Sequence, residues 1–95
     1  MKFYVMTTKT VTRESILYTY QGVLQDLPTP RRKLNYLNEC LREIRDLLRT
    51  IRPLMREPLS RRYHLGEFIT RVDIYNYQRE EGIILELIER IKTTN

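Results

Sequence analysis

The sequence predicts an all-α fold, a three-helix bundle preceded by a short extended N-terminal arm. Two observations support this prediction. Apolar residues recur at the helical period in three stretches, and proline or glycine stands between these stretches. Ninety-five residues are enough for one domain with a modest core. We therefore expect an arm over residues 1–12 and a single helical domain over residues 13–95.

The first helix is predicted over residues 13–27. Thr12 is placed to cap its N-terminus. Pro28 and Pro30 end it, because a residue that precedes proline is disfavoured in the helical conformation. Its apolar residues share one face, and they are Ile16, Leu17, Tyr20, Val23, Leu24 and Leu27.

The second helix is predicted over residues 30–52, with Thr29 as its cap and Pro30 at its first position. Its apolar residues step by three and four, which is the spacing of a seam that packs against another helix. Such a seam also fits pairing with a second copy, so a helical homo-oligomeric structural protein is one alternative. The seam consists of Leu34, Leu37, Leu41, Ile44, Leu48 and Ile51.

The third helical region is predicted over residues 67–92, after a connector at residues 53–66 that contains two prolines and ends at Gly66. Gly82 interrupts this region and disfavours a helix interior. The sequence leaves open whether Gly82 marks a bend in one helix or the boundary between two.

Positive charge gathers in the middle of the chain. Seventeen basic and twelve acidic residues give a net charge of +5, and residues 31–62 hold ten of the basic residues but only four of the acidic ones. A row of arginines follows the apolar seam one residue later, so it flanks that seam. We predict that this row binds an acidic protein or another polyanion. The partner-binding candidates are Arg42, Arg45, Arg49 and Arg52, and Arg56 continues their spacing beyond Pro53.

The composition argues against several classes of protein. No apolar run is long enough to span a membrane, and a single cysteine cannot form an internal disulfide. We interpret Cys40 as a core residue and His64 as a connector residue, so neither suggests catalysis. The three glycines form no phosphate-binding pattern. We therefore expect a binding protein without enzymatic activity, metal ion or cofactor.

Residues 16–25, Ile-Leu-Tyr-Thr-Tyr-Gln-Gly-Val-Leu-Gln, resemble the opening helix of the LYR-motif proteins of mitochondria. Tyr20 stands at the tyrosine of that motif and Gln21 at its arginine. Residues 41–49 look like the basic second helix of the family, with Leu48 at its usual phenylalanine. Residues 75–90 are similar to the tail helix of the branch that assists assembly of the mitochondrial ATP synthase.

The resemblance implies a non-enzymatic adaptor of the mitochondrial matrix, an assembly factor or accessory subunit of a larger complex. It also implies acyl carrier protein as a partner, whose acyl chain would enter between the helices. Without the resemblance, composition alone indicates a soluble intracellular protein. The candidate motif and acyl-channel residues are Leu17, Tyr20, Gln21, Leu24, Leu41 and Leu48.

A small nucleic-acid-binding protein is the other alternative. Residues 59–84 allow a helix-turn-helix, with a first helix over residues 59–65, a turn over 66–70 and a recognition helix over 71–81. Tyrosines interleaved with arginines would also suit phosphate contacts and base stacking. The arginines of this alternative are Arg61, Arg62, Arg71 and Arg79.

Overall fold

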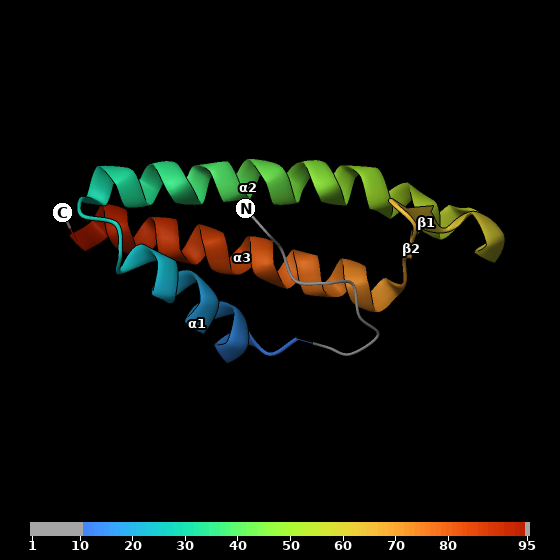
Figure 1. The fold of residues 1–95 in the computed structure, drawn as a ribbon, viewed down its shortest axis with the longest axis horizontal. Coiled ribbons are helices and arrows are strands. Elements are labelled where there is room, and N and C mark those ends of the chain that lie inside the picture. The colour runs from blue at the N-terminus through green and yellow to red at the C-terminus, as the bar shows by residue number, and fades with distance from the viewer. Residues whose placement is uncertain (1–10, 95) are drawn as a thin grey trace.

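Two long helices, α2 (Pro30–Ile51) and α3 (Arg71–Thr94), lie side by side along the long axis, and the shorter α1 (Arg13–Leu24) packs against them (Figure 1). This computed structural model describes residues 11–94. Its principal extents are 48 × 21 × 20 Å. The predicted all-α three-helix bundle is confirmed. The predicted arm lies outside the described residues except for its last two positions.

The first two helices begin where the sequence predicts. The Thr12 hydroxyl oxygen accepts a hydrogen bond from the Ser15 amide at 3.2 Å, and the Thr29 hydroxyl oxygen accepts one from the Arg32 amide at 3.2 Å. Helix α1 ends at Leu24 instead of residue 27, and residues 25–27 tighten into a turn ahead of Pro28. Both predicted N-terminal caps are confirmed, and the predicted C-terminus of α1 is three residues too far along.

Helix α3 begins at Arg71 rather than at residue 67 and continues through Gly82 to Thr94. Gly82 is therefore not a helix boundary. The helix starts at a reciprocal cap, in which the Asp73 carboxylate accepts from the Thr70 amide at 2.8 Å and the Thr70 hydroxyl oxygen accepts from the Asp73 amide at 3.3 Å. This cap fixes where the third helix starts.

The connector contains two short 3₁₀ segments, η1 (Arg52–Arg56) and η2 (Leu59–Arg61), and a hairpin of strands β1 (Tyr63–His64) and β2 (Glu67–Phe68). The predicted connector between the second and third helices is thus present, but the helix that the nucleic-acid alternative places over residues 59–65 does not form, so its helix-turn-helix is wrong. Leu65 and Gly66 have φ of +50° and +81°, which reverses the chain within two residues. The Arg62 carbonyl then accepts a hydrogen bond from the Ile69 amide at 2.7 Å.

The core lies between α2 and α3 and extends beneath α1. The predicted seam of α2 is buried from Leu37 to Ile51, while Leu34 at its start is half-buried. Val23 of the predicted α1 face is exposed instead. The seam packs against a second apolar row on α3, formed by Ile83, Ile84, Leu87 and Ile88.

Candidate functional site

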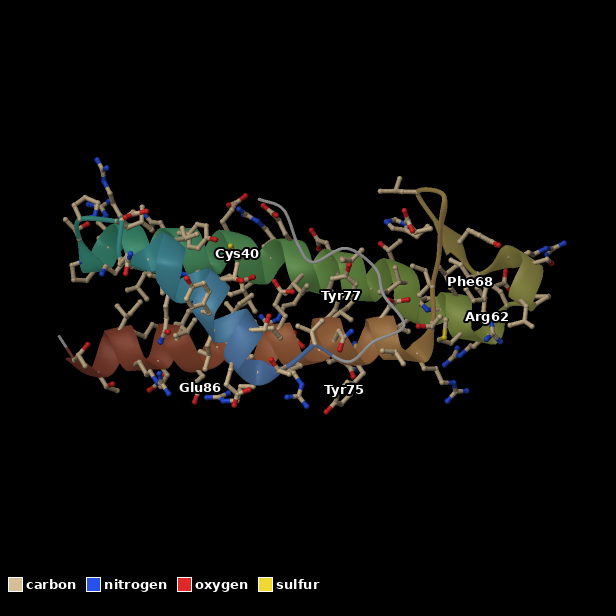
Figure 2. All side chains as sticks on the ribbon, turned by 60° about the horizontal axis from the view of Figure 1, so that its bottom comes forward. Cys40, Arg62, Phe68, Tyr75, Tyr77 and Glu86 are labelled. Atoms are coloured by element: carbon tan, nitrogen blue, oxygen red, sulfur yellow. The ribbon has the colours of Figure 1, made fainter. Side chains whose placement is uncertain are left out.

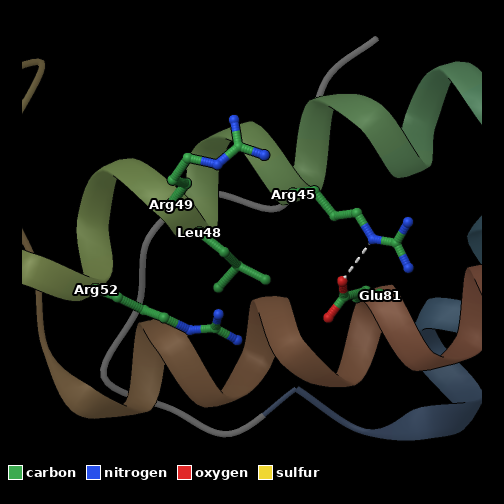
Figure 3. A pocket seen from close by; sticks show the side chains of 5 residues that line it. All are labelled: Arg45, Leu48, Arg49, Arg52 and Glu81. Carbon is green, nitrogen blue, oxygen red and sulfur yellow. Dashed lines mark hydrogen bonds and ion pairs between the residues drawn. The ribbon is translucent and has the colours of Figure 1, made fainter.

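An arginine-lined cleft opens between α2 and α3, with a volume of about 220 Å³ (Figure 3). Leu48, which is almost fully buried, forms its apolar floor. A second cleft of about 420 Å³ adjoins it, and Arg52 lines both. The first cleft is lined by Arg45, Leu48, Arg49, Arg52 and Glu81. The second is lined by Arg52, Met55, Arg56, Arg71, Ile74 and Gln78.

The spacing of the arginines explains why they meet at one place. Arg45, Arg49 and Arg52 are four and three residues apart, so they share one face of a helix. Pro53 ends α2, but the 3₁₀ segment η1 continues the chain and brings Arg56 to the second cleft. Arg71, the first residue of α3, lines that same cleft. Two segments that are adjacent in space but separated in sequence thus supply five guanidinium groups.

Positive charge exceeds negative charge around the two clefts. Glu81 is the only carboxylate among the described residues that line them, and its Oε2 accepts from Arg45 Nε at 2.9 Å. Arg49 donates to Asp46 of its own helix at 3.1 Å. Among the described residues no ion pair engages Arg52, whose side chain extends over the cleft while Arg49 points away from α3 (Figure 3). The clefts are therefore suited to an anionic group from outside the chain.

The structure brings together three of the four predicted partner-binding arginines. Arg42 lies outside both clefts, is exposed and pairs with Glu39 of its own helix. Sequence reasoning missed Ile74 and Gln78 as lining residues. These residues are three and seven positions after Arg71, and this spacing is typical of one helix face. The spacing could therefore have predicted that both lie beside Arg71.

The motif residues have a different environment. Tyr20, Leu24, Leu41 and Leu48 are buried and Leu17 is half-buried, whereas Gln21 is exposed. Except for Gln21 they pack in the core cluster, and only Leu48 also lines a cleft. Leu17, Tyr20 and Leu24 therefore hold α1 against the rest of the bundle, whereas Leu41 and Leu48 belong to the core face of α2.

Beneath α1 lies a buried polar cluster centred on Glu80, which is 2% exposed. The Tyr20 hydroxyl donates to its carboxylate. Burial raises the pKa of Glu80, and this hydrogen bond opposes the shift. The Tyr20 and Tyr36 ring centroids are 6.3 Å apart. Burial also raises the pKa of Cys40 (Figure 2), which keeps its thiol protonated at neutral pH and makes it a poor nucleophile.

The arginines of the nucleic-acid alternative are divided among different parts of the molecule. Arg61 and Arg62 belong to the connector, and Arg71 lines the second cleft. Arg79 lies two turns farther along α3, where its guanidinium carbon is 5.1 Å from the centroid of the Tyr75 ring. Two of these arginines thus belong to the connector and two to α3.

Comparison with protein-family models, with curated proteins and with solved structures finds no match to this chain. Within residues 11–94, no group of three or more histidine, cysteine, aspartate or glutamate residues is placed to hold a metal ion. No helix in this same range combines the length and the apolar character needed to cross a membrane. The arginine-lined clefts are therefore the feature of the molecule that indicates a function.

Proposed function

We propose that this protein is a non-enzymatic adaptor that binds an acidic partner protein at the two clefts between α2 and α3. The observation that carries this proposal is the set of five arginines and one carboxylate around the clefts. Guanidinium groups form strong, directional hydrogen bonds with carboxylates. The net charge of +5 would also accelerate encounter with an acidic protein.

The apolar lining favours a protein partner over a nucleic acid. Leu48, Met55 and Ile74 line the clefts beside the arginines. A surface that combines arginine with apolar side chains is typical of protein interfaces. A nucleic-acid backbone would satisfy the arginines but would leave Met55 and Ile74 without an apolar partner.

Acyl carrier protein is the partner that we propose to test first. It is acidic, and the resemblance of residues 16–25 to the LYR-motif proteins implies it as a partner. On this proposal the chain acts in the mitochondrial matrix, as an assembly factor or accessory subunit of a larger complex. Tyr20 and its neighbours would then serve by holding the bundle in shape beside the binding clefts.

The test is a titration of the full chain with purified mitochondrial acyl carrier protein, both acylated and unacylated, by calorimetry and native mass spectrometry. The double variant Arg49→Glu, Arg52→Glu should weaken binding by about 100-fold, because two attractive contacts become repulsive. Both arginines are exposed and neither pairs with α3, so the fold should survive. Arg45 is left unchanged because it holds Glu81.

The matched control is Arg31→Glu, Arg32→Glu, which makes the same charge change at exposed positions of the same helix. This control should retain near-normal affinity. Absence of any complex with the unaltered chain would contradict the choice of acyl carrier protein. Equal weakening by both double variants would contradict the clefts as the binding site.

Two further measurements address the two alternatives. Binding to duplex DNA or to RNA that falls steeply with salt would favour the nucleic-acid alternative. A mass that rises with protein concentration in sedimentation would favour the homo-oligomer. The apolar seam of α2 suggested the homo-oligomer, but this seam packs against α3 of the same chain. Packing within one chain therefore accounts for the seam without a second copy.

A further inference from the structure

The segment from Leu59 to Phe68, which we call the hairpin tip, exposes apolar side chains that the core does not use. Four of the eight large apolar or aromatic side chains exposed within residues 11–94 lie in it. The tip lies at the end of the molecule opposite the C-terminal end of α3 (Figure 1). These four side chains are Leu59, Tyr63, Leu65 and Phe68.

Leu65 at the apex of the tip is an unusual residue for a turn position with positive φ. Its φ is +50°, and Gly66 follows with φ of +81°. Two-residue hairpin turns with two positive φ values favour asparagine and glycine, because other side chains crowd the backbone there. The Leu65 side chain is also 90% exposed. Leucine therefore benefits neither the turn nor the core, and its side chain is available to an external surface.

Arginines flank this apolar apex. Arg61 is exposed, and Arg62 is held at the base of the tip because its Nε donates to the Glu57 carbonyl oxygen at 2.7 Å. From residue 52 to residue 71 the chain carries five arginines and two glutamates, a net charge of +3. An apolar apex among cations is the combination that enters the interfacial region of an anionic bilayer.

An aromatic pair supports the tip. Tyr63 lies opposite Phe68 in the hairpin register, and their ring centroids are 5.4 Å apart in an edge-to-face arrangement. Figure 2 shows Phe68 and Arg62 at the same end of the molecule. Tyrosine is enriched at membrane–water interfaces because its ring is apolar and its hydroxyl is polar. The pair thus adds interfacial side chains and connects the two strands.

We propose that the hairpin tip docks on a bilayer surface containing anionic phospholipids. Leu65 and Phe68 enter the interface, and Arg61 and Arg62 contact headgroup phosphates. A fluid bilayer accepts a projecting apolar apex without a preformed pocket, whereas nucleic acid offers Leu65 no apolar layer. This inference is independent of the adaptor proposal, because docking on lipid needs no partner protein.

The test is flotation of the full chain with vesicles of phosphatidylcholine alone and with phosphatidylserine added at roughly one part in four, a strongly anionic composition. The chain should bind the anionic vesicles and bind less as salt rises. Leu65→Asn should lower the partition coefficient by about tenfold, since a leucine leaves the interface. Its Tm should stay the same or rise, because asparagine tolerates positive φ. This opposite change in binding and stability separates docking from unfolding.

Matched controls isolate the tip. Leu85→Asn alters an exposed leucine on α3 and should leave vesicle binding unchanged. Arg61→Glu should weaken binding by about tenfold, whereas Arg31→Glu at the exposed start of α2 should not. Because the chain contains no tryptophan, Phe68→Trp supplies a single reporter whose emission should shift to the blue on anionic vesicles.

Three results would overturn the proposal: no binding of the unaltered chain to anionic vesicles, undiminished binding of Leu65→Asn, or equal losses for Leu65→Asn and Leu85→Asn. A failure here leaves binding of acyl carrier protein unaffected, because that titration contains no lipid. Loss of vesicle binding only in Arg49→Glu, Arg52→Glu would assign the lipid contact to the clefts and likewise contradict the tip.

Discussion

Two neighbouring glutamates on α3 have different environments, because one lies in the region covered by α1 and the other lies in the open region at the clefts. Glu80 lies under α1, is buried and accepts the Tyr20 hydroxyl. Glu81 lies at the open cleft and pairs with Arg45 at 2.9 Å. Successive helix residues are rotated by about 100°, so one position separates a core carboxyl from an ion-paired one. The position of α1, more than the residue type, determines the role of each glutamate.

The same contrast holds for larger parts of the molecule. Figure 1 shows α1 alongside the half of α3 that is nearer the C-terminus. Under that cover, the Tyr20 hydroxyl donates to the Glu80 carboxylate. The clefts lined by arginine lie on another face of α3, which carries Arg71, Ile74, Gln78 and Glu81, and surplus positive charge remains there for a partner. Stability and binding thus belong to different faces of α3, and variants should affect one without the other.

The largest effect on stability is expected for Tyr20→Ala, in the covered region. It should lower the free energy of unfolding by about 3–5 kcal/mol, because a buried ring is lost and Glu80 loses its donor. Urea unfolding followed by circular dichroism measures this loss. Tyr18→Ala is the control, because Tyr18 is on the same helix but 81% exposed. A similar loss for both variants would show that α1 does not cover a core at all.

A smaller effect, and of opposite sign, is expected for Glu80→Gln. Burial raises the folded-state pKa of Glu80 above its ordinary value of 4.5, so as the pH rises the unfolded chain releases this proton first. The group therefore favours the folded state below pH 4.5 and loses that contribution as the pH rises through the folded-state pKa. Glutamine cannot ionise and still accepts from Tyr20, so at neutral pH the variant should be more stable than the unaltered chain.

Urea unfolding from acidic to neutral pH checks this expectation. The difference between Glu80→Gln and the unaltered chain should widen toward neutral pH and shrink in acid. Parallel curves with no change in the difference would mean that the Glu80 carboxyl ionises in the folded chain as readily as in water.

The smallest effect is expected for Glu81→Gln in the open region. It should lower the free energy of unfolding by about 0.5 kcal/mol or less, because the Arg45–Glu81 pair is partly exposed to water. Chemical unfolding at low and high salt measures the change, which should shrink as salt screens the pair. A loss comparable to that of Tyr20→Ala would remove the distinction between the two regions.

The hairpin shows where sequence reasoning failed. Residues 59–65 carry leucine, tyrosine and arginine, which all tolerate helices, so the nucleic-acid alternative allows a helix within the predicted connector. Two-residue hairpin turns normally have asparagine or glycine at both positions, but here only Gly66 fits that preference. Leu65, the turn residue that departs from this preference, is also the residue that we propose enters a lipid surface. Conflict between local preference and observed structure is typical of sites used for function.

Local sequence was sufficient for the helices, two of their caps, the buried seam of α2 and the row of arginines beside it. Capping and periodicity involve residues only a few positions apart, so the chain itself specifies them. The tertiary structure alone decided that Arg42 stays outside the clefts while Arg71 joins them, and that Glu80 is buried. The contact that holds Glu80 joins residues 60 positions apart. No local pattern encodes such a contact, because it exists only after α1 packs against α3.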